Sequence, residues 1–201
     1  MARRGPDGID HRVQGTVAFG QCMLRTTPES LEEHQPLGNE GGSLVLIMDG
    51  RVDNFDELRC ELLARGAQLR DRSDAELVLR AYEAWGEDCP DRIIGEFVFF
   101  IWDARRRCLF GARDAAGTRH FYYHWETGRI LFASEIKGIL ATELVAPRLN
   151  DSRVLDFLVP EYDRDDQIGT FYRDILRLPA GHAIAVGAHG VKTWRYWSPE
   201  N

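Results

Sequence analysis

The sequence predicts an α+β fold, in which helices and antiparallel strands occupy separate parts of the chain. Helical patterns gather between residues 54 and 95, strand-like pairs dominate residues 97–134, and a last strand pair follows at 182–197. Such grouping is typical of α+β proteins rather than of doubly wound parallel sheets. With 201 residues and a 44% apolar share, the chain is suited to bury the core of one domain.

An uncharged, β-favouring run precedes the helical part. Residues 45–48 predict a buried strand, and Asp49-Gly50 predicts the turn that ends it. Asn54 then stands where an N-cap residue is expected, and Gly66 is the stop signal of the helix that begins there. This pattern predicts a strand, a turn and a helix in direct succession.

A second helix is predicted from Ser73 to just before Gly86. Its first residues, Ser73 to Glu76, have the S-x-x-E form of a capping box, in which each side chain accepts a bond from a backbone amide. A short third helix is expected after it, beginning near Pro90. One face of the second helix is apolar, as expected for a helix that packs on a core: Leu77, Val78, Ala81 and Trp85.

The C-terminal half is strand-like and predicts three antiparallel hairpins. The strand at 97–102 is apolar throughout, which indicates a sheet covered on both faces, by helices and by another sheet. The hairpins are expected at 97–102 with 108–113, at 120–125 with 130–134, and at 182–186 with 191–197. Two short helices are expected between the second and third hairpins, at 135–140 and at 151–158.

Charge and composition exclude several classes of function. A net charge of −7, from 25 basic and 32 acidic side chains, argues against nucleic-acid and anionic-membrane binding, because both need a basic field. We expect no membrane-spanning stretch and no secretory signal, because no apolar run is long enough, and the histidines have no metal-ligand spacing. We therefore expect a cytoplasmic protein without a metal site. The four cysteines form no CxxC pair and are expected to be reduced: Cys22, Cys60, Cys89 and Cys108.

Ten segments, taken in order, resemble the N-terminal domain of asparagine synthetases. They cover essentially the whole chain. The chain is therefore identified as a member of the class II glutamine amidotransferase domains of that family, which includes glutaminase-deficient relatives of the β-lactam synthetase and lasso peptide cyclase type. The segments are Arg4-Gly-Pro-Asp-Gly8, Gln35-Pro-Leu37, Asp49-Gly-Arg-Val-Asp-Asn54, Ser73-Asp74, Gly95–Asp103, Ala112–Gly117, Phe121–Tyr123, Phe132–Lys137, Leu178–His182 and Tyr196-Trp197.

The resemblance implies an N-terminal-nucleophile (Ntn) hydrolase fold, an αββα sandwich of two antiparallel sheets between helical layers. In that family the first residue of the mature chain is a cysteine, whose own α-amino group serves as the base. The present sequence begins Met1-Ala2, so no catalytic residue is expected in the chain as written. We expect a sandwich that lacks its first strand and shows a gap there. The amidotransferase-like domain is expected at 1–197, with a linker beginning at 198–201.

The resemblance also places the residues that hold glutamine in the family, and here several differ. Met23 stands where the family has the arginine that pairs with the substrate carboxylate. Asp49 replaces the asparagine of the oxyanion hole, whereas Gly50 keeps its backbone donor. Asp74 keeps the carboxylate for the substrate amino group, with a helix-start role as the alternative. Asn54 is either a site residue or a helix cap, with the cap favoured.

Two hypotheses about function stay open. The chain is either the amidotransferase part of an enzyme that transfers amide nitrogen from glutamine to an ATP-activated carboxylate such as aspartate, or a pseudo-amidotransferase that braces a synthetase domain without hydrolysis. No phosphate-binding loop occurs in the sequence, so no cofactor is expected in this chain. ATP and Mg²⁺ are implied only for a synthetase domain acting in cis or in trans, and glutamine binding is expected to be weak or lost.

Overall fold

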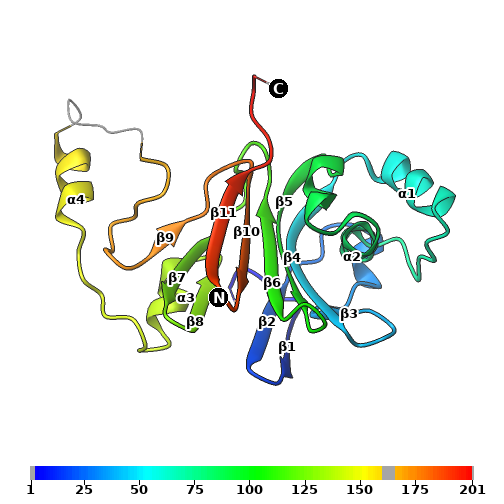
Figure 1. The fold of residues 1–201 in the computed structure, drawn as a ribbon, viewed down its shortest axis with the longest axis horizontal. Helices are drawn as coiled ribbons and strands as arrows, with labels where there is room; N and C mark the ends of the chain where they lie inside the picture. The colour runs from blue at the N-terminus through cyan, green and yellow to red at the C-terminus, as the bar shows by residue number, and fades with distance from the viewer. Residues whose placement is uncertain (1–2, 160–165, 201) are drawn as a thin grey trace.

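The fold is organised around a six-stranded antiparallel sheet, in the order β11-β10-β6-β5-β4-β3. The computed structural model describes residues 3–159 and 166–200. In Figure 1 this sheet stands at the centre of the molecule. Its strands are β3 (Leu37–Gly38), β4 (Leu44–Val52), β5 (Gly95–Asp103), β6 (Cys108–Arg113), β10 (His182–Gly187) and β11 (Gly190–Arg195).

Strand β5 is buried on both faces, which confirms the prediction from its apolar sequence. Successive side chains of a strand point to opposite faces. Phe97 and Phe99 therefore belong to the core on the helical side of the sheet. Val98 and Phe100 belong to a second core on the other side. The sheet is thus the middle layer between a helical layer and a further layer of strands.

The helical layer consists of α1 (Phe55–Ala64) and α2 (Asp74–Trp85), followed by the 3-10 helix η2 (Gly86–Arg92). Figure 1 shows α1 and α2 together on the β4 side of the sheet. Helix α2 has an apolar face because Leu77, Val78 and Ala81 recur at helical spacing, and all three are fully buried. The two helices predicted from the sequence are confirmed with boundaries close to those expected.

The opposite layer consists of two separate groups of strands. One is the hairpin of β1 (Gly8–Gln14) and β2 (Val17–Met23). The other is a three-stranded sheet in the order β8-β7-β9. Phe100 joins this layer to the central sheet, since its ring stacks on Phe121 at 4.3 Å and on Phe132 at 4.6 Å. The strands of the second group are β7 (Tyr122–Glu126), β8 (Arg129–Ala133) and β9 (Leu176–Arg177).

Two further helices lie beside this second layer. Helix α3 (Ile136–Leu140) packs through Ile139 against Tyr122 and Leu131 of β7 and β8. Helix α4 (Asp151–Leu158) lies beyond it, at the left of Figure 1. No helix within residues 3–159 and 166–200 is long and apolar enough to cross a membrane.

The three predicted hairpins are confirmed by antiparallel pairing of β5 with β6, β7 with β8, and β10 with β11. The predicted turn at Asp49-Gly50 is wrong, because β4 continues through both residues and pairs with β5 as far as Val52. An Asp-Gly pair is common in turns, so the local sequence does not distinguish a glycine inside a strand from one in a turn. The hairpin of β1 and β2 had not been predicted as such. All four cysteines are free.

Candidate functional site

The predicted glutamine-site residues lie around the C-terminal end of β4. The loop before β1 approaches closely here, since a Cβ on Gly5 would overlap the carbonyl of Cys22 and the backbone of Met23. From the same loop, Arg4 reaches Asp49 on β4. The structure therefore brings Met23 and Asp49 into one neighbourhood, through the loop that carries the Arg-Gly-Pro-Asp motif.

Asp49 lies between two arginines. Its Oδ2 is 3.9 Å from a guanidinium nitrogen of Arg4, and its Oδ1 is 3.7 Å from one of Arg119. Arg4 also lies 3.5 Å from Glu135, and Arg119 lies 3.5 Å from Glu96. These separations are ion-pair contacts longer than hydrogen bonds. Asp49 is thus a carboxylate whose charge is offset by cations from two other segments.

Gly50 follows Asp49 in a conformation that requires glycine. Its φ is +141°, and a Cβ there would overlap the carbonyl oxygen of Glu96 on the neighbouring strand. Side chains rarely adopt such a φ, and the backbone of β5 leaves no room for one. The glycine of the predicted oxyanion position is therefore explained by packing alone, whether or not it also serves a ligand.

Asp74 begins α2 and lies half-buried near the end of β4. Burial raises the pKa of Asp74 to about 6, and the carboxylate of Glu33 adds to the rise. The backbone amide of Val52 and the guanidinium of Arg51 act in the opposite direction. Burial likewise raises the pKa of Glu33. Two carboxyl groups with perturbed pKa values in one place form a group that attracts a cation or a proton.

Met23 ends β2 and is buried, with only 8% of its surface exposed. A thioether there offers no charge to a carboxylate. Strand β2 is tied to β4 beside it, because the side-chain amide of Gln21 donates to the carbonyl of Met48 at 2.9 Å. Met1 and Ala2, with which the sequence begins in place of the family's cysteine, lie outside the described residues.

Asn54 occupies the N-cap position of α1, but its side chain makes no capping hydrogen bond. Instead its Nδ2 donates to the carbonyl of Arg92 at 3.0 Å, and its Oδ1 accepts from the amide of Ile94 at 2.9 Å. The favoured interpretation as a side-chain cap is therefore wrong. Asn54 thus links the segment before β5 to the start of α1, and both the nitrogen and the oxygen of its side-chain amide are hydrogen-bonded.

Three residues near the predicted positions had not been singled out from the sequence: Arg4, Glu33 and Arg119. Arg119 is placed by its loop, because the buried Asp114 accepts from the amide of Arg119 at 3.2 Å. Arg113 also donates to the carbonyl of Arg119 at 2.5 Å. The Arg-Asp pair before Gly117 was the available signal, since it indicates a tightly held loop. This pair does not predict that Arg119 lies beside Asp49, because that contact depends on the tertiary structure.

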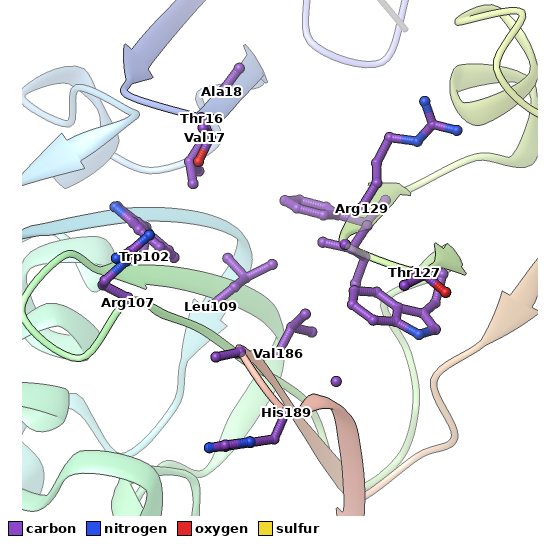
Figure 2. Close-up of a pocket in the computed structure, with 17 residues that line it drawn as sticks. Thr16, Val17, Ala18, Trp102, Arg107, Leu109, Thr127, Arg129, Val186 and His189 are labelled. Carbon is purple, nitrogen blue, oxygen red and sulfur yellow. The ribbon is translucent and has the colours of Figure 1, made fainter.

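A separate hollow of about 570 Å³ lies at the other end of β2, where the chain turns between strands. Figure 2 shows Thr16 and Val17 on one side of it and Arg129 on the other, with Leu109 and Val186 between them. The hollow is thus bounded by the β1–β2 and β7–β8 hairpins and floored by the central sheet. No group of three or more histidine, cysteine or acidic side chains within the described residues is placed to hold a metal ion.

Comparison with known proteins gives a family and a fold. The profile of a family described as "Glutamine amidotransferase domain" matches residues 1–197. The chain is 34% identical over 202 residues to the glutamine-hydrolysing asparagine synthetase 3 of Bacillus subtilis, covering 100% of this chain and 33% of that protein. It is 33% identical over 141 residues to the amidase chyE of Penicillium rubens, covering 70% and 21%.

Among solved structures, the chain is similar to the glutamine phosphoribosylpyrophosphate amidotransferase of Bacillus subtilis, determined with ADP and GMP. The TM-score is 0.60 at 20% identity, over 92% of this chain and 36% of the other. At that identity the likeness concerns the fold. The chain spans a third or less of the length of the two relatives compared above, 33% and 21%.

Proposed function

This chain belongs to the class II glutamine amidotransferase family related to asparagine synthetases and fungal amidases, and from that premise we propose that it is a degenerate amidotransferase domain. In a complete protein such a domain serves amide transfer from glutamine to an ATP-activated carboxylate such as aspartate. We infer that the pocket of this chain does not hydrolyse glutamine. ATP and Mg²⁺ would belong to a synthetase domain, in cis or in trans.

The observation that carries this proposal is the carboxylate of Asp49. An oxyanion hole needs hydrogen-bond donors aimed at developing negative charge. An ionised Asp49 has only acceptors to offer, and it lies between Arg4 and Arg119, whose charges it offsets. Met23 adds a second defect, because a buried thioether cannot form a bidentate bond with the carboxylate of glutamine.

The candidate site retains two acidic residues. Asp74 and Glu33 could still attract the ammonium group of an amino acid, since both are half-buried carboxyl groups with raised pKa values. Without a cation for the substrate carboxylate, this contact alone corresponds to weak glutamine binding. We therefore propose a pocket that has lost the oxyanion donor and the cation for the substrate carboxylate, and has retained the contact with the substrate ammonium group.

Glutamine binding tests this directly, by isothermal titration calorimetry at pH 7.5 on the chain and on the Met23→Arg/Asp49→Asn double variant. We expect no binding by the native chain up to about 10 mM and measurable binding by the double variant, as the charge-assisted contact is worth about 1.5–3 kcal/mol. A native chain that binds glutamine below 1 mM, or a full-length protein that hydrolyses it, would show the proposal to be wrong.

A second function is favoured by the same two residues. A pseudo-amidotransferase that braces a synthetase domain has no need of an oxyanion donor or a substrate arginine, so Asp49 and Met23 would be under no constraint to resemble those of active relatives. Removal of this domain from the full-length protein should then lower the stability or the ATP-dependent activity of the synthetase part. Glutamine should leave that activity unchanged.

We also propose that the strand layer opposite the central sheet has one vacant strand position, as an Ntn sandwich lacking its first strand would have. The central sheet has six strands, whereas β1-β2 and β8-β7-β9 contribute five. Strands β2 and β8 each pair on one side only, and both line the hollow. One strand between them would join the two groups into a second six-stranded sheet.

A further inference from the structure

The face of the β8-β7-β9 sheet that points away from the central sheet carries a cluster of basic and aromatic side chains. Tyr122 of β7 pairs directly with Arg177 of β9, and side chains opposite one another in an antiparallel pair lie on the same face. The ring of His120 lies 6.3 Å from the ring of Tyr122. Phe121 and Leu176 point instead into the core shared with the central sheet. His120, Tyr122 and Arg177 thus lie together on the outer face.

Arg177 is a partly buried cation with no ion-pair partner in the described part of the chain. Its guanidinium carbon lies 5.8 Å from the centre of the Tyr122 ring, which is a cation–π contact. Its Nε is buried and has no hydrogen-bond acceptor among the residues that the structure describes. Arg148, in contrast, forms an ion pair with Asp174 at 2.8 Å. Because a buried charge is costly without a partner, Arg177 favours the approach of an anion.

The charges that act on His120 are positive. Burial lowers the pKa of His120, and the charges of Arg113 and Arg177 lower it further. Arg4 acts in the same direction. The guanidinium of Arg113 donates only to backbone carbonyls, so it forms no hydrogen bond with a carboxylate. The imidazole therefore lies in a positive field, which a bound anion would offset.

Asp166 is the described carboxylate that is influenced by Arg177. Hydrogen bonding by the amide of Gly169 lowers the pKa of Asp166 most, and Arg177 adds to this effect. The Oδ1 of Asp166 accepts from the amides of Ile168 and Gly169, each at 2.9 Å. Asp166 is thus held by its own turn and acts on Arg177 through its charge alone, without an ion-pair contact.

We propose that His120 and Arg177 bind a phosphate group, free or as a monoester, beside the ring of Tyr122. A phosphate group carries a charge of about −1.5 to −2 at neutral pH and offers three acceptor oxygens, so it can bond to donors from two separate segments at once. A guanidinium group is well suited to such an anion. Arg4 and Arg113 would add to the attraction through their charge. Neither donor belongs to the glutamine site, so the inference is independent of the proposed function.

Proton NMR of the histidine rings tests the proposal. The 201-residue chain is titrated from about pH 5 to pH 8 in sodium chloride, inorganic phosphate or methyl phosphate at equal, low ionic strength. A bound phosphate group favours the protonated imidazole, so the pKa of His120 should rise by about half a pH unit or more. A rise with both phosphates assigns a site open to monoesters, and a rise with inorganic phosphate alone assigns free phosphate.

Two other histidines serve as internal controls. The Nδ1 of His124 lies 2.7 Å from the carbonyl of Asp174, and the Nδ1 of His182 lies 2.8 Å from that of Ala180. Each ring therefore has a backbone partner of its own, and its titration should be the same in chloride and in phosphate.

Three variants identify the donors, with affinity measured from the His120 shift at about pH 6.5. Arg177→Gln should weaken phosphate binding about tenfold, because a hydrogen bond to a charged group is lost. The matched control Arg148→Gln, at an exposed arginine that is paired with Asp174, should leave the affinity unchanged. Asp166→Asn should tighten binding about twofold, since it removes the opposing charge and keeps an Oδ1 for the turn.

The gain expected for Asp166→Asn cannot arise from general damage to the fold, so the two variants together separate charge from stability. An unchanged pKa of His120 in both phosphates, an equal rise for His124 and His182, or full phosphate affinity in Arg177→Gln would each overturn the proposal.

Discussion

Replacing Glu76 by glutamine distinguishes between two roles of this residue at the start of α2. It is either a capping-box residue or the buried ion-pair partner of two arginines. The sequence predicts a capping box, in which Glu76 bonds back to the amide of Ser73. In the structure Ser73 does cap the helix, since its Oγ accepts from the amide of Glu76 at 3.2 Å. Glu76 itself turns away and accepts from the Nε of Arg70 at 2.9 Å and from the Nε of Arg80 at 2.7 Å. The predicted box is therefore only half formed.

The two roles differ in the cost of this substitution. Glutamine serves a capping box as well as glutamate does, so the change would be nearly neutral there. Glu76 is fully buried, however, and is the common partner of Arg70 and Arg80. Breaking a buried ion pair by removing one partner costs about 3–5 kcal/mol. Arg70 is partly exposed and Arg80 keeps Glu83, so we expect a loss of about 2–4 kcal/mol.

Urea unfolding at pH 7, followed by tryptophan fluorescence, measures this loss. The matched control is Glu83→Gln, because Glu83 pairs with the same Arg80 at 2.8 Å but is a third exposed, and its loss should stay below about 1 kcal/mol. If Glu76→Gln unfolds within about 0.5 kcal/mol of the native chain, the buried ion pairs contribute little and our reasoning is wrong.

Two further predictions concern the candidate site. Because burial raises the folded-state pKa of Asp74 to about 6 from 3.8, the folded chain binds that proton more tightly than the unfolded chain does, so stability falls as pH rises from about 4 to 6. Asp74→Asn should abolish this pH dependence, measured as urea midpoints between pH 4 and 7, and should stabilise the chain by about 1–2 kcal/mol at pH 7. If the pH dependence is unchanged in the variant, another group causes it. Gly50→Ala should cost about 3 kcal/mol or more in thermal unfolding, since its Cβ would overlap the Glu96 carbonyl, whereas the control Gly20→Ala should be close to neutral.

Much of the fold follows from local patterns. The uniformly apolar sequence of β5 predicted a strand buried on both faces, and its residues do supply apolar side chains to two cores. The apolar face of α2 predicted a helix packed on the sheet for the same reason. The hairpin of β1 and β2 was not predicted because exposed, half-buried and buried residues follow one another in it without a clear period of two.

The candidate site was predicted in part. The motifs pointed to Asp49, Gly50, Asp74 and Met23, and the structure places the first three along the end of β4 and the start of α2. Asn54 was misassigned as a side-chain cap because an asparagine before a helix has the same local sequence whether it bonds its own helix or a neighbouring segment. The choice depends on the chain around Ile94, which lies beside Asn54 only in the folded molecule.

The amino-acid sequence by itself determined the types of most elements and the family, and it predicted that Met23 and Asp49 replace two glutamine-site residues. Those properties are local, since they depend on periodicity and on the identity of single residues within motifs. Only the tertiary structure decided that Arg4 and Arg119 flank Asp49, that Glu76 joins two arginines, and that the first residues of β2 and β8 line one hollow. These contacts join segments distant in sequence, and no local pattern encodes which distant side chains the packing of two layers brings together.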